Sequence, residues 1–340
     1  MKVAIGYEIQ KGPWGGGNAF AKSLSDYLKF RNIKVVSDLN DKDIDIILLT
    51  DPRGFSPQVT IDAGKIIRYL LFKNNKSIIV HRINECDERK GTTNMNSLLK
   101  RANFVADHTI FIATWLKNLD IHFNDKGSHI ILNGGDDKIF NSKNGSVWNQ
   151  KEPIKLVTHH WGGNHLKGMD VYIKLDELLS EKKWKNIFQF TYIGNIPGNY
   201  KFKNVKHIKP CNGKKLAKHL KKNHIYLTAS KNEPGGMHHI EGALCGLPIL
   251  FRDSGSLPEY CKKYGISFQG IEDIVLSLEK MMDNYKILKE KMKFYDRTAD
   301  KMCSEYNSLF NELYKNRRTL VKKRNLLKSP WLILRNQIPI

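Results

Sequence analysis

The chain of 340 residues carries 56 lysine and arginine side chains against 34 aspartate and glutamate side chains, a formal net charge of +22. Its length is about twice that of a typical domain, so we expect two domains. No apolar run is long enough to cross a membrane and the N-terminus lacks a signal-peptide pattern, which favours a cytoplasmic protein. The cysteines are scattered and odd in number, so neither a disulfide framework nor a zinc site is expected.

The positive charge could serve a nucleic acid, an anionic lipid surface or an anionic substrate. Lysine greatly outnumbers arginine, however, and such a compositional bias raises the charge without selection for binding. No RNA-binding or helix-turn-helix signature occurs. A nucleic-acid-binding protein is therefore only a distant alternative, and no nucleic acid partner is expected.

Strand and helix patterns alternate along the first part of the chain. Strands are predicted at residues 2–7, 44–50, 77–83, 109–113 and 129–132, and helices at residues 19–30, 61–72 and 96–102. This alternation is typical of a parallel sheet wrapped by helices. The polar stretch 141–146 interrupts it and is the predicted linker, so the first domain is expected to span residues 1–145.

A second alternating series follows the linker. Strands are predicted at residues 154–158, 188–193, 225–228 and 248–252, and helices at residues 169–179, 214–222 and 237–245. The expected fold class is therefore α/β, with two doubly wound, Rossmann-like domains. The second domain is expected to span residues 150–295, followed by a C-terminal helix and basic tail at residues 296–340.

Two glutamates flank a turn and a helix start directly after the strand predicted at residues 225–228. The run from Glu233 to Glu241 contains Gly235, Gly236 and Met237, which suit a turn that opens a helix. Backbone N–H groups at such a helix start bind phosphate well, so these three residues are candidates for donor binding. Carboxylates accept hydrogen bonds from the vicinal hydroxyls of a sugar. The sequence therefore predicts a nucleotide-sugar as the ligand.

This run resembles the Glu-x7-Glu motif of the retaining glycosyltransferases of family 4, which have the GT-B fold. The likeness continues through residues 241–248, Glu-Gly-Ala-Leu-Cys-Gly-Leu-Pro, where the family usually has Glu-Ala-x-Ala-x-Gly-x-Pro, and it reaches residues 255–259. The resemblance covers roughly residues 1–315 and is strongest over residues 154–262. It implies that the two Rossmann-like domains face a central cleft.

The resemblance also implies a reaction. A sugar moves from a nucleoside-diphosphate sugar to an acceptor hydroxyl with retention at the anomeric carbon, in the synthesis of cell-surface polysaccharide or glycolipid. Glu233 is expected to be catalytic by orienting the sugar hydroxyls, and Glu241 to hold the nucleotide ribose. The acceptor is expected to be a glycan or a lipid-linked molecule, and neither a metal nor another cofactor is expected. A nucleotide-sugar epimerase or hydrolase of the same fold is the alternative.

Two further loops match loops of the family. The glycine-rich run 12–18 opens the first helix, and the family's glycine-rich loop lines the cleft, so Gly16 and Gly17 are candidates for donor binding; a plain flexible turn is the alternative. Lys167-Gly168 matches a Lys-Gly pair whose ammonium binds the donor diphosphate. The family's arginine is missing from residues 159–168, and Asn164, His160 or His165 could replace it. Several histidines occur there, but no carboxylate lies among them, so a metal site is not expected.

Charged residues end the strand predicted at residues 77–83. Ligands of open α/β sheets bind beyond the carboxyl ends of strands. In the family a histidine near this place touches the transferred sugar, so His81 and Arg82 are candidate catalytic residues. Asn84 and Glu85 are candidates for acceptor recognition. A charged loop that pairs with itself is the alternative interpretation.

The C-terminal tail is basic and contains apolar residues. After Glu312 the chain has no acidic residue, and Trp331 and several leucines stand among the cations of residues 315–340. This composition suits an anionic membrane surface, which would place the protein on the inner face of the membrane. The alternative is that the tail docks on the first domain.

Overall fold

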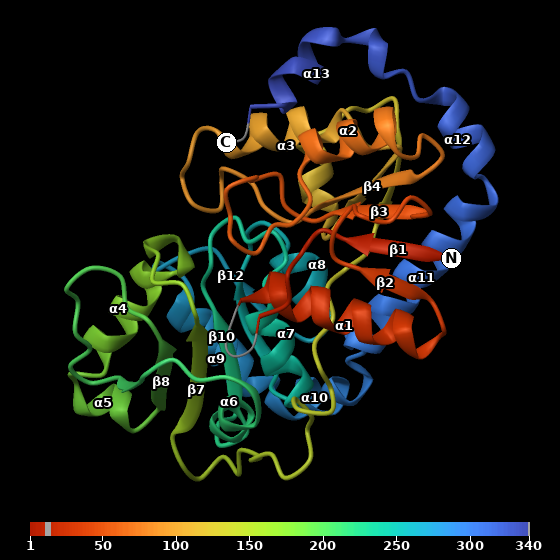
Figure 1. Ribbon diagram of the computed structural model, residues 1–340. Helices are drawn as coiled ribbons and strands as arrows, with labels where there is room; N and C mark the ends of the chain where they lie inside the picture. The colour runs from red at the N-terminus through yellow and green to blue at the C-terminus, as the bar shows by residue number, and fades with distance from the viewer. Residues whose placement is uncertain (11–14, 339–340) are drawn as a thin grey trace. The chain divides into compact units, whose positions relative to one another are not determined.

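The structure is a computed structural model that describes residues 1–10 and 15–338 (Figure 1). The chain forms two compact units. The first comprises Met1–Asn133 together with Ala299–Ile340, and the second comprises Gly134–Thr298. All five cysteines are free thiols, as their scattered spacing predicts. Among the described residues, none of the helices combines the length and the apolar character needed to cross a membrane.

The first unit is built on a six-stranded parallel sheet in the order β2-β1-β3-β4-β5-β6. Its strands are β1 (Lys2–Ile5), β2 (Lys34–Val36), β3 (Ile46–Leu49), β4 (Ile78–Ile83), β5 (His108–Phe111) and β6 (Gly127–Ile130). Its first three α-helices are α1 (Gly16–Phe30), α2 (Ala63–Phe72) and α3 (Met95–Asn103). One face of the sheet shares a core with α1, and the other shares a core with α2 and α3.

The second unit repeats this plan with a parallel sheet in the order β12-β11-β10-β7-β8-β9. Its strands are β7 (Ile154–His160), β8 (Phe188–Gly194), β9 (Lys206–Ile208), β10 (Ile225–Thr228), β11 (Ile249–Arg252) and β12 (Gly265–Phe268). Its α-helices are α4 (Met169–Leu178), α5 (Lys182–Lys185), α6 (Gly213–Leu220), α7 (Met237–Leu244), α8 (Leu257–Cys261), α9 (Ile274–Asp283) and α10 (Tyr285–Lys291). Helices α4, α9 and α10 share a core cluster with one face of the sheet, and α7 packs against β7 and β10.

The order of the strands in the second sheet creates a switch point between β7 and β10. The chain adds β8 and β9 on one side of β7 and then crosses over to add β10 on the other side. Because both strands are parallel, the loops that follow them, residues 161–168 and 229–236, leave the sheet at the same edge. Ligands of open parallel sheets bind at such points.

The C-terminal segment returns to the first unit. Helix α11 (Ala299–Lys315) packs against α1, and Met302, Tyr306 and Phe310 of α11 complete the core that contains Phe20. The division of the chain therefore differs from the predicted one, because the first unit ends at Asn133 and regains residues from Ala299 onward. The predicted linker at residues 141–146 belongs to the second unit, where the N–H of Ser146 donates to the carbonyl of Lys221 (2.8 Å).

The rest of the tail also lies on the first unit. It contains α12 (Arg317–Lys323) and α13 (Pro330–Asn336), and α13 packs against α2 and α3 (Figure 1). Leu326 and Ile333 pack against the core of the first unit, and the buried Arg324 guanidinium pairs with Asp107. One side of the tail is therefore docked on the first unit, as the alternative interpretation of the tail predicts.

Candidate functional site

The loop after β7 is shaped to present Lys167. Its short turn, His165–Lys167, is capped by Asn164, whose Oδ1 accepts from the N–H of Leu166 (2.8 Å). Gly168 follows with a φ of 98°, and a Cβ there would overlap the backbone of Ala229. Only glycine tolerates both conditions. The Lys-Gly pair is therefore a structural unit in which Gly168 allows the loop to lie against the end of β10.

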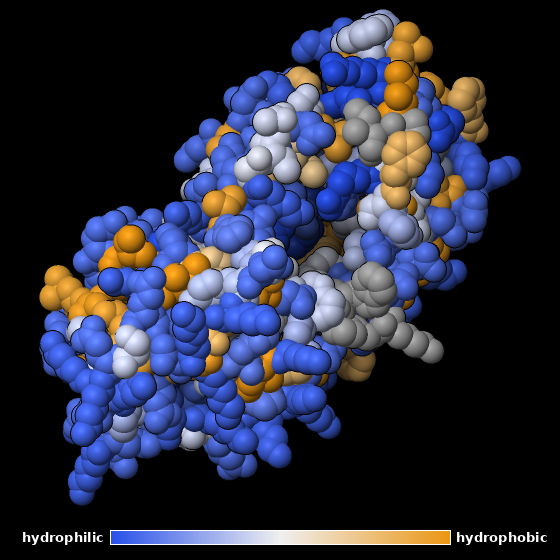
Figure 2. Space-filling view, turned by 90° about the vertical axis from the view of Figure 1, so that its left-hand side faces the viewer, coloured by the Kyte–Doolittle hydropathy of each residue, from blue (hydrophilic) through white to orange (hydrophobic). Residues whose placement is uncertain are grey.

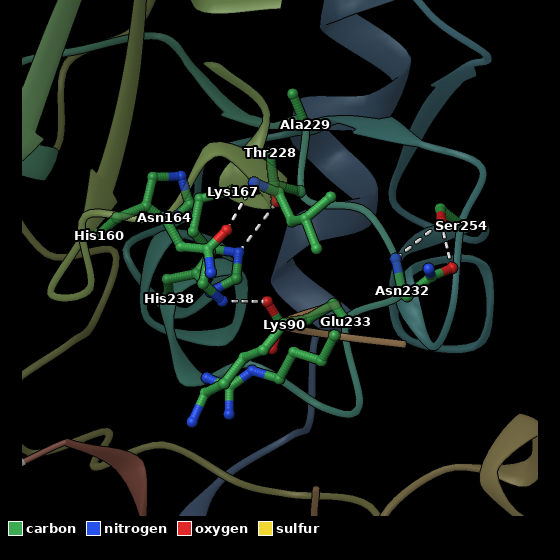
Figure 3. A network of polar contacts seen from close by, with 12 residues as sticks. Lys90, His160, Asn164, Lys167, Thr228, Ala229, Asn232, Glu233, His238 and Ser254 are labelled. Atoms are coloured by element: carbon green, nitrogen blue, oxygen red, sulfur yellow. Dashed lines mark hydrogen bonds and ion pairs between the residues drawn. The ribbon is translucent and has the colours of Figure 1, made fainter. Parts of the chain in front are cut away.

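The ammonium of Lys167 binds the carboxylate of Glu233, with 2.5 Å between Nζ and Oε2 (Figure 3). The side chain of Glu233 is 2% exposed and that of Lys167 is 13% exposed, so the pair lies largely out of water. The two loops are also joined through the backbone, since the N–H of Lys231 donates to the carbonyl of Leu166 (2.7 Å). The structure thus brings together Lys167 and Glu233, which the sequence predicts to serve one ligand.

The backbone around Glu233 is fixed from a third loop. The carbonyl of Glu233 accepts from the N–H of Ser256 (2.8 Å), and the N–H of Asn232 donates to Oγ of Ser254 (2.9 Å; Figure 3). Gly255 has a φ of 59°, and a Cβ there would lie 2.6 Å from the backbone nitrogen of Glu233. These contacts hold the buried carboxylate on a rigid loop.

Helix α7 begins directly after Glu233. Gly236 is its N-cap and makes no capping hydrogen bond with a side chain, and Gly235 has a φ of 159°. A Cβ at Gly236 would lie 3.0 Å from Cδ of Glu233 and would press on the ring of His238. The glycines therefore let the start of α7 lie against the carboxylate, with the first N–H groups from Met237 onward directed to the same edge.

Glu241 lies in the second turn of α7, and its side chain is 19% exposed. Its Oε2 accepts from Nε2 of His159, the penultimate residue of β7, at 2.8 Å. The second predicted glutamate is thus near the surface of the unit and already has a partner on the neighbouring strand.

Two buried histidines lie beneath these loops. Nε2 of His160 is 2.8 Å from the hydroxyl of Tyr172, and Nε2 of His238 is 2.9 Å from Oγ1 of Thr228 (Figure 3). Burial holds the pKa of both imidazoles well below the ordinary value of 6.5, so both rings are neutral near pH 7. A neutral, enclosed His160 cannot supply the positive charge of the missing arginine. His165 is exposed, and Asn164 is occupied as a cap.

Within residues 1–10 and 15–338, no three His, Cys, Asp or Glu side chains are arranged to hold a metal ion. The groups available for an anion at this edge are the Lys167 ammonium and the N–H groups of α7.

The glycine-rich candidates lie at the start of α1. Gly16 and Gly17 are the first residues of the helix, and Gly15 precedes them as an N-cap without a side-chain capping bond. The amide of Asn18 bonds the backbone of Gln10 in both directions, at 2.7 and 3.0 Å. The residues of this loop between 11 and 14 lie outside the described part of the chain.

The structure contradicts the prediction that His81 and Arg82 face a ligand. Both side chains are buried inside the first unit. Nδ1 of His81 is 3.1 Å from Nδ2 of Asn103. Arg82 donates to Tyr306 (3.1 Å) and to Asn133 (2.9 Å). The reason is their position within β4, because strand residues inside a covered sheet point alternately into the two helical layers.

The residues that follow β4 are mostly paired with their own loop. The Glu85 carboxylate binds Arg89 at 2.7 Å and Lys90 at 3.3 Å. This is what the self-pairing interpretation predicts. Asn84 is half-buried, and acceptor recognition by Asn84 and Glu85 stays a prediction.

Comparison with known proteins gives the class. Residues 162–299, which include Lys167, Glu233 and Glu241, match the sequence model described as glycosyl transferases group 1. The predicted enzyme class, glycosyltransferase, is confirmed. No curated protein has a sequence that matches this chain significantly.

Solved structures show that this glycosyltransferase has the predicted GT-B fold class. A sucrose-phosphate synthase of Thermosynechococcus elongatus is similar with 14% identity and a TM-score of 0.62, over 92% of this chain and 99% of that one. The Anabaena protein HepE, solved with UDP, has 11% identity and a TM-score of 0.65, over 92% and 100%. A glycosyltransferase of Rickettsia africae has 13% identity and a TM-score of 0.57, over 91% and 85%.

Sequence reasoning missed several residues of the candidate site. His159 and Thr228 lie at the ends of β7 and β10, and Tyr226 lies inside β10. The three contact the predicted site residues or their neighbours. Their position before the two functional loops was visible in the sequence. The contacts between them depend on the pairing of strands β7 and β10, which are about seventy residues apart in the chain.

Proposed function

We propose that the chain is a retaining, family 4 glycosyltransferase that moves a sugar from a nucleoside-diphosphate sugar to an acceptor hydroxyl. The observation that carries this proposal is the meeting of Lys167, Glu233 and the start of α7 at the switch point between β7 and β10. The match to glycosyl transferases group 1 and the UDP in the similar HepE structure support the same class of donor.

The proposed mechanism gives each group one task. The leaving diphosphate gains negative charge as the bond to the anomeric carbon breaks, and the Lys167 ammonium and the N–H groups at Gly235, Gly236 and Met237 stabilise that charge. Because Lys167 binds Glu233, its ammonium would lie between the carboxylate and the diphosphate in the complex. Glu233 would accept hydrogen bonds from hydroxyls of the transferred sugar.

The remaining candidates concern the nucleotide and the acceptor. Glu241 would accept hydrogen bonds from the ribose hydroxyls, and Gly16 and Gly17 would admit a ligand close to the backbone at the start of α1. We propose a glycan or lipid-linked acceptor, used in cell-surface polysaccharide or glycolipid synthesis.

The donor is tested by thermal unfolding with UDP-, GDP- and ADP-sugars. A ligand at 100 times its Kd adds about 2.7 kcal/mol to the free energy of unfolding, so the true donor should raise the midpoint clearly. NMR of the products, with and without an acceptor, would then show transfer with retention. Epimerised or hydrolysed donor formed at the same rate without acceptor would favour the epimerase or hydrolase, and a total lack of binding would contradict the proposal.

Activity is expected to survive chelation. Lys167 and the α7 N–H groups are fixed in place and can stabilise the diphosphate without a cation. Turnover should therefore be the same in EDTA and in added magnesium or manganese. A loss of turnover in EDTA that either metal restores would contradict this prediction.

The outer side of the tail is proposed to contact an anionic membrane. The docked tail leaves Leu327, Trp331, Leu334 and Ile338 more than three-fifths exposed. The exposed cations Lys328 and Arg335 lie among them. Most of the face seen in Figure 2 is hydrophilic, with apolar residues in small groups. Apolar side chains that insert beside cations are the pattern of a peripheral membrane segment, at about 1 kcal/mol per cation near an anionic surface.

Membrane contact is tested by flotation with vesicles of phosphatidylglycerol and phosphatidylcholine. The double variant Trp331→Gln with Leu334→Gln should float at least about 10-fold less than the native chain, because two inserted side chains are lost. Phe30→Gln, at an 85% exposed position of α1, is the matched control and should float normally. Native flotation of the double variant would contradict membrane contact through the tail.

A further inference from the structure

The carboxylate of Glu241 is held by a residue that the family motif does not contain. Its partner, His159, lies on β7, is buried, and contacts Oε2 of Glu241 through Nε2 at 2.8 Å. A carboxylate has about four acceptor positions, so this one bond restricts its rotation while leaving capacity for ribose hydroxyls. The orientation of Glu241 therefore depends on His159 offering a proton at Nε2.

Tyr226 determines which nitrogen of His159 carries that proton. The hydroxyl of Tyr226 accepts from the backbone N–H of His159 (3.2 Å) and lies 3.1 Å from Nδ1, closer than the carbonyl of His159 at 3.5 Å. Burial raises the pKa of Tyr226 well above its ordinary value, so the phenol keeps its proton. With that proton given to Nδ1, the imidazole carries its own proton on Nε2, directed at Glu241.

Gly242 makes room for this arrangement. The ring of Tyr226 lies against the helix at Gly242, where any Cβ would overlap it. Gly242 stands inside α7, where glycine destabilises a helix by about 1 kcal/mol relative to alanine. The motif that this segment resembles usually has alanine at this position. Glycine in place of the motif's alanine therefore leaves the space that the Tyr226 ring occupies when it contacts His159.

We infer that His159, with its tautomer set by Tyr226, is a positioning residue for the ribose-binding carboxylate Glu241. This inference rests on the proposed function, which assigns the ribose to Glu241. It deepens that function because it makes ribose recognition in this chain depend on three linked groups: the Tyr226 phenol, the His159 imidazole and the Glu241 carboxylate.

The test is calorimetric binding of UDP and 2′-deoxy-UDP, or of GDP and 2′-deoxy-GDP if GDP binds more tightly. For the native chain the deoxy form should bind about 10-fold more weakly, because a hydrogen bond to a charged group is lost. His159→Leu should weaken binding of the ribonucleotide about 10-fold and reduce the discrimination against the deoxy form to about 2-fold. In steady-state kinetics the donor KM should rise while kcat changes little.

Two milder variants keep the inference falsifiable if His159→Leu does not fold. His159→Gln retains an N–H near the position of Nε2 and should restore most of the discrimination. Tyr226→Phe should lose part of it, because the imidazole is then free to adopt the other tautomer. The control is His224→Gln, a buried histidine of the same unit that accepts from the N–H of Lys155 (3.1 Å) and should alter stability only.

The outcomes distinguish a failure of the proposed function from a failure of the inference about His159. If the native chain binds none of the UDP-, GDP- and ADP-sugars, the proposed function fails. If the native chain binds and discriminates, and His159→Leu discriminates equally well, then His159 does not position Glu241 and this inference is overturned. Equal losses in His159→Leu and His159→Gln, with a lower unfolding midpoint in both, would likewise overturn it in favour of a purely structural role.

Discussion

Glu233→Gln is expected to lower kcat at least about 10²-fold, a loss of about 2.7 kcal/mol of transition-state stabilisation. The buried Glu233 carboxylate is proposed to accept hydrogen bonds from the sugar that strengthen as positive charge develops at the anomeric carbon. Glutamine keeps the shape and one oxygen acceptor but loses the charge. The donor KM should change much less, because the ground-state sugar carries no such charge.

Glu241→Gln is the matched comparison, since it makes the same chemical change eight positions later on α7. A ribose remote from the reacting bond is bound about equally in the ground state and the transition state. The donor KM should therefore rise with little loss of kcat. Steady-state kinetics on both variants, with circular dichroism to verify folding, measures the difference. A Glu233→Gln variant with near-native kcat would refute the catalytic assignment of Glu233.

Lys167 needs a different design, because its removal affects folding as well as catalysis. Lys167→Ala should reduce kcat and raise the donor KM, since the ammonium binds the diphosphate before and during reaction. It also leaves the buried Glu233 carboxylate without this partner, which typically destabilises a protein by about 3–5 kcal/mol. The double variant Lys167→Ala with Glu233→Gln should recover stability but not activity, which separates the two effects.

The sequence predicted the central part of each sheet and several residues of the candidate site. The inner strands are apolar runs with clear boundaries, so β3, β4, β7, β8, β10 and β11 were all expected within a few residues. The outer strands β2, β9 and β12 were missed, because they are short and partly exposed and have no continuous apolar pattern. Lys167 and Glu233 were both assigned to the donor through their resemblance to family motifs, and the structure adds their direct contact.

The errors came from features that depend on tertiary packing. His81 and Arg82 were assigned to a ligand from their closeness to the end of a strand, but they lie within β4 and are enclosed by the helical layers. The return of α11 to the first unit follows from an apolar stripe that completes a core over 270 residues away in the chain. The contact between Tyr226 and Gly242 depends on how closely α7 approaches β10, which no local pattern encodes.

The ligand-free protein is expected to lose stability steeply as the pH falls from 6.5 towards 4. Burial lowers the pKa of His81 to about 3 and the pKa of His108, His224 and His239 to about 4. The unfolded chain protonates these histidines near pH 6.5, so below that pH the unfolded state binds more protons than the folded state and gains stability relative to it. The free energy of unfolding therefore begins to fall when the pH drops below the unfolded-state pKa of about 6.5, and it falls until the pH reaches the folded-state pKa of about 3 to 4. Above pH 6.5 the full stability is present.

The magnitude makes this the largest predicted effect on stability. At pH 5.5 each neutral buried histidine costs about 1.4 kcal/mol, so the four together cost roughly 6 kcal/mol, comparable to the whole free energy of unfolding of many domains. The carboxylates whose pKa values are lowered, such as Asp170 and Asp176, lose their contribution only below their ordinary pKa of 3.8. A decline that begins near pH 6.5 therefore reports the histidines.

Urea unfolding at pH 7.5, 6.5 and 5.5 and constant ionic strength measures this loss. His81 and His108 belong to the first unit and His224 and His239 to the second, so the midpoints of both units should fall together. His224→Gln removes one titrating group and should make the decline for the second unit shallower by about 1 kcal/mol at pH 5.5. Equal urea midpoints at pH 7.5 and 5.5 would mean that these histidines are protonated in the folded protein. Their side chains would then have to be more exposed to water than the structure shows.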